Sequence, residues 1–141
     1  MNITRSKDSL ALATNLIGIP YLINGKSPTG FDCWGLVWYF YSKIGNKISK
    51  PTDHENRKTS SQKDKVFNKT IISNKFIKIK KPVDNCVVSF SINDYTVHVG
   101  IWIESQNKCL HSCMKSGVVL ESLSNIKIRK GLTYNFYLWQ K

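Results

Sequence analysis

The sequence has no apolar run long enough to cross a membrane. A spanning helix needs an uninterrupted stretch of ~18 apolar residues, and every apolar segment here is broken before that length. No internal repeat occurs either. A chain of 141 residues with 41% hydrophobic content has the size and composition of one domain around a single core. We therefore expect one domain over residues 1–141 and no membrane partner.

The N-terminus also lacks the features of a secretory signal peptide. Residues 10–23 are apolar, but Thr14 and Asn15 interrupt them, Asp8 precedes them, and no small-residue cleavage site follows. The spacing of the apolar residues predicts an amphipathic helix over residues 6–17 instead.

Acidic residues are scarce. Nine Asp and Glu stand against 21 Lys and Arg, which gives a formal net charge of +12 and favours an anionic partner. The lysines are scattered through residues 63–65, 75–81 and 127–130, and no nucleic-acid-binding motif is present. Nucleic acid is therefore not the expected partner.

One of the four cysteines lies where a helix is predicted to begin. Cys33 follows Asp32, whose carboxylate can cap the first turn, and the turn-forming segment 27–30 precedes both. Apolar residues at helical spacing follow at Leu36, Val37, Phe40 and Ile44. The positive end of the helix dipole and the free N–H groups favour a thiolate and can hold an oxyanion. Cys33 is therefore the candidate nucleophile.

Two of the three histidines can complete a thiol site. His98 lies inside an apolar, strand-like run, and His111 follows thirteen residues later. A cysteine, a histidine and a third polar group form a base-activated nucleophile. Strand alternation turns His98 away from its valine neighbours, either into the core or toward a cleft. His54 lies in a polar loop and is expected to be solvated.

The order of elements predicts an α+β fold. Helices are expected at 6–17 and from Cys33 onward, and the polar segment 49–74 is expected to be a surface excursion with a short helix near 60–67. Alternating patterns predict strands at residues 75–80, 86–92, 96–105, 108–113, 117–120 and 134–139. The helical half of the chain would thus pack against the stranded half.

Cys109 and Cys113 flank His111, and a strand would place all three on one face. A metal site is one interpretation, but zinc sites normally join two cysteine pairs and no second pair exists here. We therefore expect the two cysteines to be packing neighbours of His111. With Cys33 assigned to catalysis, the other three form an odd set that does not indicate disulfides. No metal or organic cofactor is expected.

These pieces, taken in order, resemble the NlpC/P60 family of cysteine peptidases, which cut the peptide part of bacterial peptidoglycan. The segments that carry the resemblance are residues 16–21, 28–37, 98–101 and 110–111. The resemblance as a whole runs from roughly residue 10 to residue 119. Trp34, directly after Cys33, is more similar to phage tail-tip members than to secreted wall hydrolases.

Two positions depart from the family pattern. Many secreted members carry a small hydroxyl residue after the nucleophile, so Trp34 predicts a more apolar site wall. Before the base strand the family usually shows a Gly-Asp turn, whereas residues 82–85 read Pro-Val-Asp-Asn. The aspartate is kept and the glycine is not.

The resemblance implies a papain-like α+β fold, with Cys33 at the start of a helix packed on an antiparallel sheet of about five to six strands. It also implies the catalytic roles. Cys33 would be the nucleophile, His98 the base and His111 the group that orients His98. The Cys33 N–H and the Tyr21 hydroxyl would hold the oxyanion, and Asp32 and Trp34 would complete the substrate site.

The function implied is a phage or prophage tail-associated endopeptidase that cuts the peptidoglycan stem, most simply between D-glutamate and the diamino acid. Alternatives are an injected antibacterial toxin with the same chemistry and a cognate immunity protein, and a non-catalytic module that binds murein or caps a tail. An acyltransferase or deamidase on another amide is a further alternative. The protein is expected to be made in the cytoplasm and carried to the wall by a phage particle, a secretion machine or lysis.

Overall fold

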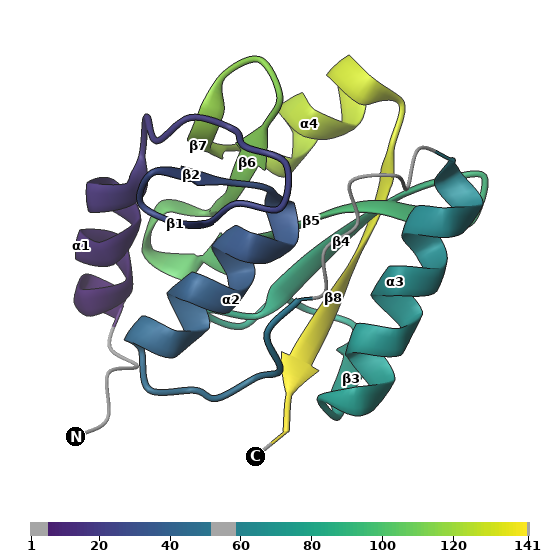
Figure 1. Cartoon of the computed structure of the whole chain (residues 1–141), viewed down its shortest axis with the longest axis horizontal. Helices are drawn as coiled ribbons and strands as arrows, with labels where there is room; N and C mark the ends of the chain where they lie inside the picture. The colour runs from purple at the N-terminus through teal and green to yellow at the C-terminus, as the bar shows by residue number, and fades with distance from the viewer. Residues whose placement is uncertain (1–5, 52–58, 141) are drawn as a thin grey trace.

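The computed structural model describes residues 6–51 and 59–140, and these residues form the predicted α+β fold (Figure 1). The helices are α1 (Ser6–Leu16), α2 (Cys33–Lys43), α3 (Ser60–Ser73) and α4 (Leu123–Lys130), with a short 3-10 turn at Glu104–Gln106. The strands are β1 (Lys26–Ser27), β2 (Gly30–Phe31), β3 (Phe76–Ile79), β4 (Val87–Ile92), β5 (Tyr95–Ile103), β6 (Lys108–Cys113), β7 (Gly117–Glu121) and β8 (Thr133–Trp139).

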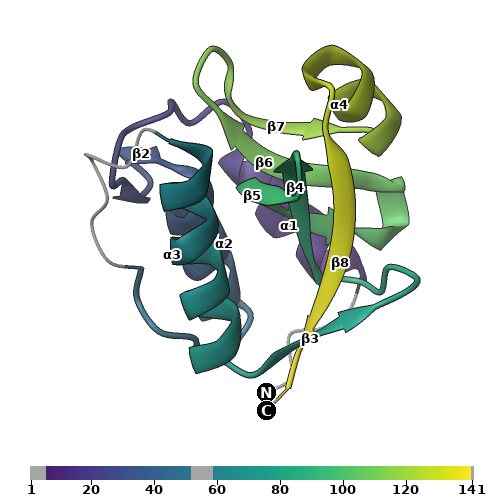
Figure 2. The ribbon, with the colours of Figure 1, turned by 90° about the vertical axis from the view of Figure 1, so that its right-hand side faces the viewer.

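Six of these strands form one sheet in the order β3-β8-β4-β5-β6-β7, and each neighbouring pair is antiparallel. Strands β1 and β2 form a separate small hairpin just before α2. Figure 2 shows α2 and α3 on one side of the large sheet. The strand count and the antiparallel pairing agree with the prediction. No helix among the described residues combines the length and the apolar character that crossing a bilayer requires.

Helix α2 forms where the sequence predicted it. The Asp32 side chain accepts a hydrogen bond from the Gly35 N–H at 2.7 Å and so caps the first turn. Leu36, Val37 and Phe40 have no exposed surface. Burial of such side chains contributes roughly 1.5–3 kcal/mol each, so the apolar face fixes the helix, and with it Cys33, against the sheet.

The described part of the polar segment after residue 58 contains a longer helix than predicted. Helix α3 runs from Ser60 to Ser73 and begins with a capping box formed by Thr59 and Gln62. Phe67 is only 3% exposed and its ring lies 5.9 Å from that of Trp34. The helix expected near residues 60–67 is therefore present, but it continues to Ser73 and buries a face against the core.

The sheet is covered on both faces. One core contains the buried sides of α1, α2 and α3 with alternate strand residues such as Val87, Ile101 and Leu110. The second core, on the opposite face, includes Trp102 and Ile126 from α4. Helix α4, which the sequence analysis did not predict, begins at the cap residue Ser122 and ends at Gly131, whose φ is 63°.

Candidate active site

A cleft of about 690 Å³ opens at the N-terminus of α2. Four of the six predicted site residues line it, namely Tyr21, Cys33, Trp34 and His98. Helix α3 adds Lys63, Val66 and Phe67 to the wall, and β5 adds Val97 and Val99. The cleft is therefore made by segments that are far apart in the sequence, with the candidate nucleophile and the candidate base on the same surface.

Asp32 lies below this surface rather than on it. Its side chain is 2% exposed, and its second oxygen accepts a hydrogen bond from the Asn24 N–H at 3.1 Å. A side chain on Gly35 would collide with the Gly25 carbonyl oxygen at 1.8 Å. The hairpin loop and the helix start are thus packed backbone to backbone, and Asp32 joins them beneath the cleft surface.

The Cys33 thiol is half-buried in the cleft, while the other three cysteines are buried free thiols. Burial and the adjacent Asp32 carboxylate raise the pKa of Cys33 to about 12. Backbone hydrogen bonds from Val99 and Trp34 and the charge of Lys63 lower the same pKa, but by less. The helix start does favour the thiolate, as predicted, yet burial outweighs it. Burial thus opposes ionisation of this thiol, which calls for a nearby base.

A line of hydrogen bonds runs away from the cleft behind His98. His98 Nε2 lies 2.9 Å from His111 Nδ1, and His111 Nε2 lies 2.9 Å from Glu121 Oε1. His111 is fully buried. The two histidines therefore lie within hydrogen-bonding distance of each other, as predicted. Glu121, from β7, was not among the predicted site residues.

Strand register explains the position of Glu121. His111 pairs with Val119 across β6 and β7, and Glu121 pairs with Cys109. Glu121 is therefore diagonal to His111 on the same face, within reach of a long side chain. The only sequence signal was an acid at the end of an otherwise apolar strand.

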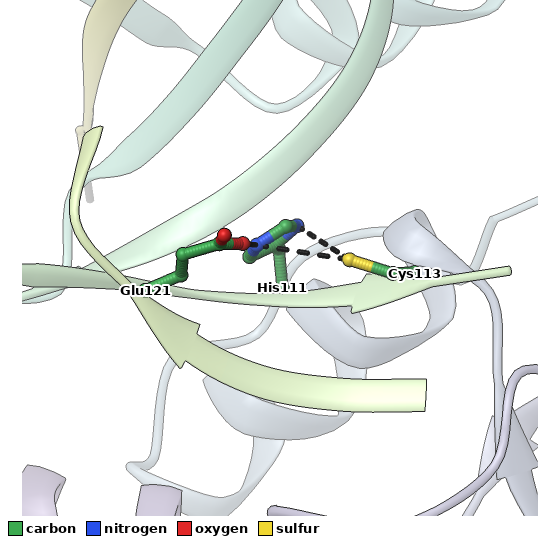
Figure 3. Close-up of side chains that lie close together, drawn as sticks. All are labelled: His111, Cys113 and Glu121. Carbon is green, nitrogen blue, oxygen red and sulfur yellow. Dashed lines mark hydrogen bonds and ion pairs between the residues drawn. The ribbon is translucent and has the colours of Figure 1, made fainter. Parts of the chain in front are cut away.

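Donor atoms of His111, Cys113 and Glu121 all lie within 4.8 Å of one another (Figure 3). The Cys113 sulfur is 3.3 Å from Nδ1 and 3.7 Å from Nε2 of the same ring. Such donors suit zinc. This set differs from the alternative considered in the sequence, because Glu121 replaces Cys109, whose buried thiol contacts the Leu110 carbonyl instead. Cys113 packs against the His111 ring, as predicted, and Cys109 is buried in the second core.

Tyr21 lies in the same cleft as Cys33, and backbone hydrogen bonds of the two residues before it hold it there. The Pro20 carbonyl accepts a hydrogen bond from the Phe31 N–H at 3.1 Å, and the Ile19 carbonyl accepts one from the Val118 N–H at 2.9 Å. Burial, followed by the nearby Cys33 and Asp32, raises the pKa of Tyr21 to about 12. The phenol therefore keeps its proton and can donate a hydrogen bond into the cleft.

Trp34 is 5% exposed and stacks near Phe67, so the cleft has the apolar wall that the sequence predicted. Sequence reasoning missed Ser112, which also lines the cleft and donates a hydrogen bond to the Phe31 carbonyl at 2.8 Å. That bond ties β6 to the residue before Asp32. His54 lies outside the described residues.

The turn at residues 82–85 keeps a tight shape without glycine. Asn85 adopts a left-handed backbone with a φ of 69°, which asparagine tolerates better than most residues. Its carbonyl accepts a hydrogen bond from the Tyr41 hydroxyl at 2.6 Å. The left-handed residue of this turn thus follows the aspartate, and α2 is bonded to the loop before β4.

A helix-capped thiol on an antiparallel sheet, with a histidine pair behind it, defines a papain-like cysteine hydrolase fold. The sequence profile of the NlpC/P60 family matches residues 18–135, and the chain belongs to that family. Members of the family are generally cysteine peptidases. A comparison with curated protein sequences finds no match.

Solved structures agree on the fold. The NlpC/p60 domain of the peptidoglycan hydrolase SagA superposes with a TM-score of 0.63 at 20% identity, over 95% of this chain and 99% of that one. NlpC1 from Trichomonas vaginalis gives 0.64 at 14% identity, over 96% of this chain and 45% of that one. A lipoprotein-like NLP/P60 protein from Staphylococcus aureus gives 0.58 at 22% identity, over 96% and 42%.

Proposed function

We propose that this chain is a cysteine endopeptidase that hydrolyses an amide bond in the peptidoglycan stem peptide. The observation that carries the proposal is the cleft that Cys33 and His98 share, with His111 bonded behind His98 at 2.9 Å. The family membership supports the reaction class, and the resemblance of the active-site segments supports the bond between D-glutamate and the diamino acid.

In the proposed reaction His98 takes the proton from Cys33 as the sulfur attacks the amide carbonyl. The carbonyl oxygen becomes an oxyanion, which the Cys33 N–H and the Tyr21 hydroxyl stabilise. His98 then gives its proton to the leaving nitrogen as the C–N bond breaks. A water molecule, deprotonated by His98, releases the acyl group and regenerates the thiol. His111 orients His98 throughout.

The raised pKa of Cys33 shapes this sequence of events. A thiol whose pKa is about 12 is almost fully protonated at neutral pH. His98 is therefore needed to take this proton and form the thiolate–imidazolium pair that attacks the carbonyl. Substrate that enters the apolar cleft excludes water and brings the base, the thiol and the carbonyl together.

The role of the surface charge is to hold the enzyme on its substrate. A net charge of +12 favours binding to murein and its acidic polymers. Delivery to the wall by a phage tail, a secretion machine or lysis is part of the proposal, and each route uses the same chemistry. Tail genes beside the coding sequence would support the phage route, and a small immunity gene would support an injected toxin.

The deciding experiment is digestion of purified murein followed by mass analysis of the products. Wild-type protein should release fragments cut at one stem-peptide bond, and Cys33→Ala should release none while binding sacculi normally. If neither protein alters murein and both bind it, the protein is a non-catalytic murein-binding module instead. Transfer or deamidation products in place of hydrolysis products would replace the peptidase assignment.

A further inference from the structure

The hydrogen bonds behind His98 end on a carboxylate that the proposed catalytic set does not include. We infer that Glu121 is a positioning residue that fixes the tautomer of His111 and, through it, the tautomer of His98. This inference rests on the proposed function of His98 as the base. Figure 3 shows the Glu121 carboxylate directed at the His111 ring, and the Nε2 to Oε1 distance is 2.9 Å.

The argument follows the protons outward from Glu121. An ionised carboxylate only accepts hydrogen bonds, so His111 Nε2 must carry a proton. A neutral His111 then presents a lone pair at Nδ1, and the partner of that atom is His98 Nε2 at 2.9 Å. His98 Nε2 must therefore be the donor. A neutral His98 then carries its own lone pair on Nδ1, the nitrogen that can take the proton of Cys33.

Burial makes this choice of tautomer matter. His111 has no exposed surface, so water does not compete for its nitrogens. Phe90 and Cys113 flank the ring, with the Phe90 centroid 6.3 Å away and the Cys113 sulfur 3.3 Å from Nδ1. A thiol is a weak hydrogen-bonding group in either direction. Glu121 is thus the strongest acceptor facing His111, and it selects the Nε2–H form.

The carboxylate also acts during the reaction. When His98 becomes an imidazolium, its charge lies two short hydrogen bonds away from Glu121, along a part-buried path through the fully buried His111. Electrostatic interactions are stronger in such surroundings than in water. Glu121 therefore stabilises the charged intermediate as well as the resting tautomer.

Side-chain length is part of the geometry. Glu121 pairs directly with Cys109 and reaches His111 across the diagonal. Aspartate at this position would be one methylene too short to span the diagonal. Glutamine keeps the reach and an acceptor oxygen but loses the charge. These substitutions separate reach, hydrogen bonding and charge.

The test compares Glu121→Gln, Glu121→Asp and Glu121→Leu, with Glu104→Gln as the control for loss of one strand-end carboxylate. We expect kcat of the Asp and Leu variants to fall by at least ~10-fold, the scale on which groups that orient a functional imidazole act. Glu121→Gln should keep more activity than either, and Glu104→Gln should match wild type. KM should change little, because Glu121 does not line the cleft.

A second readout measures the tautomer itself. Nitrogen-15 chemical shifts of the His111 ring should report the Nε2–H form in wild type and in Glu121→Gln, and a mixture of forms in Glu121→Leu. If Glu121→Leu does not fold, the comparison of the Gln and Asp variants decides the matter. A proton on Nδ1 of His111 in wild type, or full kcat in Glu121→Asp, would overturn the inference.

Two further outcomes distinguish this inference from a metal site at Glu121 and from the proposed peptidase function. If dialysis against a chelator abolishes wild-type activity, Glu121 holds a metal with His111 and Cys113, and the positioning role is wrong. If Cys33→Ala is as active as wild type, the proposed peptidase function fails, whereas the tautomer measurement still tests the role of Glu121.

Discussion

Asp64, on α3, accepts a hydrogen bond from the backbone N–H of Thr96, on β5, at 2.9 Å. Thr96 lines the cleft, and so does Lys63, the residue before Asp64. The other Asp64 oxygen accepts a hydrogen bond from the Asn68 side chain, one turn along the helix. This carboxylate therefore fastens α3, which forms one wall of the cleft, to β5, the strand that carries His98.

Removing this attachment should loosen the wall of the cleft. Asp64→Ala leaves a part-buried N–H without its acceptor, so the free energy of unfolding should fall by about 1–3 kcal/mol. KM should rise while kcat changes little, because the reacting groups are untouched. Denaturant unfolding and steady-state kinetics measure the two effects. Asp64→Asn should be milder, and Lys69→Ala, on the same helix, should match wild type. An unchanged KM in Asp64→Ala would show that α3 does not shape the substrate site.

The reactivity of Cys33 should depend steeply on pH. Because its pKa is raised to about 12, the thiolate fraction, and the rate of alkylation by iodoacetamide, should rise about tenfold per pH unit from pH 7 to 10. Peptide mapping should find Cys33 labelled first, since the other cysteines are buried. A rate that is already constant below pH 7 would indicate a preformed thiolate and contradict this view.

Asp32→Asn tests the cause of that raised pKa. Asparagine caps helices as well as aspartate does, so α2 should still begin at Cys33. The loss of the negative charge should lower the pKa of Cys33, because the carboxylate raises it in wild type. Alkylation at pH 8 should be faster than in wild type, with Asp8→Asn as the control for net charge. Slower or equal alkylation would mean that the carboxylate does not oppose the thiolate.

The two histidines should leave different kinetic marks. His98→Ala should abolish turnover about as completely as Cys33→Ala, since base and nucleophile act as one unit. His111→Asn should keep part of the activity, because an amide oxygen still accepts the His98 N–H, and His111→Ala should keep much less. Hydrolysis of a soluble stem peptide measures all three. Equal activity in every His111 variant would reduce this residue to a packing role.

Salt should weaken binding to the wall and leave the chemistry intact. The Debye length falls from ~10 Å at 0.1 M to ~3 Å at 1 M, which screens a net charge of +12. Cleavage of whole sacculi and their capture by the Cys33→Ala protein should fall together over this range. Cleavage of a small stem peptide should barely change. An equally steep fall with the small peptide would place the lysines in the active site itself.

Local signals in the sequence were sufficient for the nucleophile helix. A cap residue, a preceding turn and an apolar face lie within a few residues of Cys33, and the structure contains the capped helix that they predicted. The strand boundaries were likewise close, because alternation is a local property. Both the helix and the strands could be predicted because their signals lie within a few neighbouring residues of the sequence.

The parts that were missed depend on long-range pairing. Glu121 reaches His111 only because β6 and β7 pair in one particular register, which spacing alone does not give. Helix α3 was underestimated because its first six residues are polar, and the packing partner of its buried residue Phe67, Trp34, lies 33 positions earlier in the sequence. Ser122 and Gly131 cap α4, but the sequence analysis considered residues 127–130 only for their charge.

Strand β8 has a consequence for the order of folding. It is the last of the described strands along the sequence, yet it pairs with both β3 and β4 inside the sheet. A growing chain therefore cannot complete this sheet until residues 133–139 have been synthesised, and contacts of such long sequence separation form slowly. The hydrolase is expected to stay inactive while it is being translated, and activity should appear as a late event, after the whole sheet has assembled.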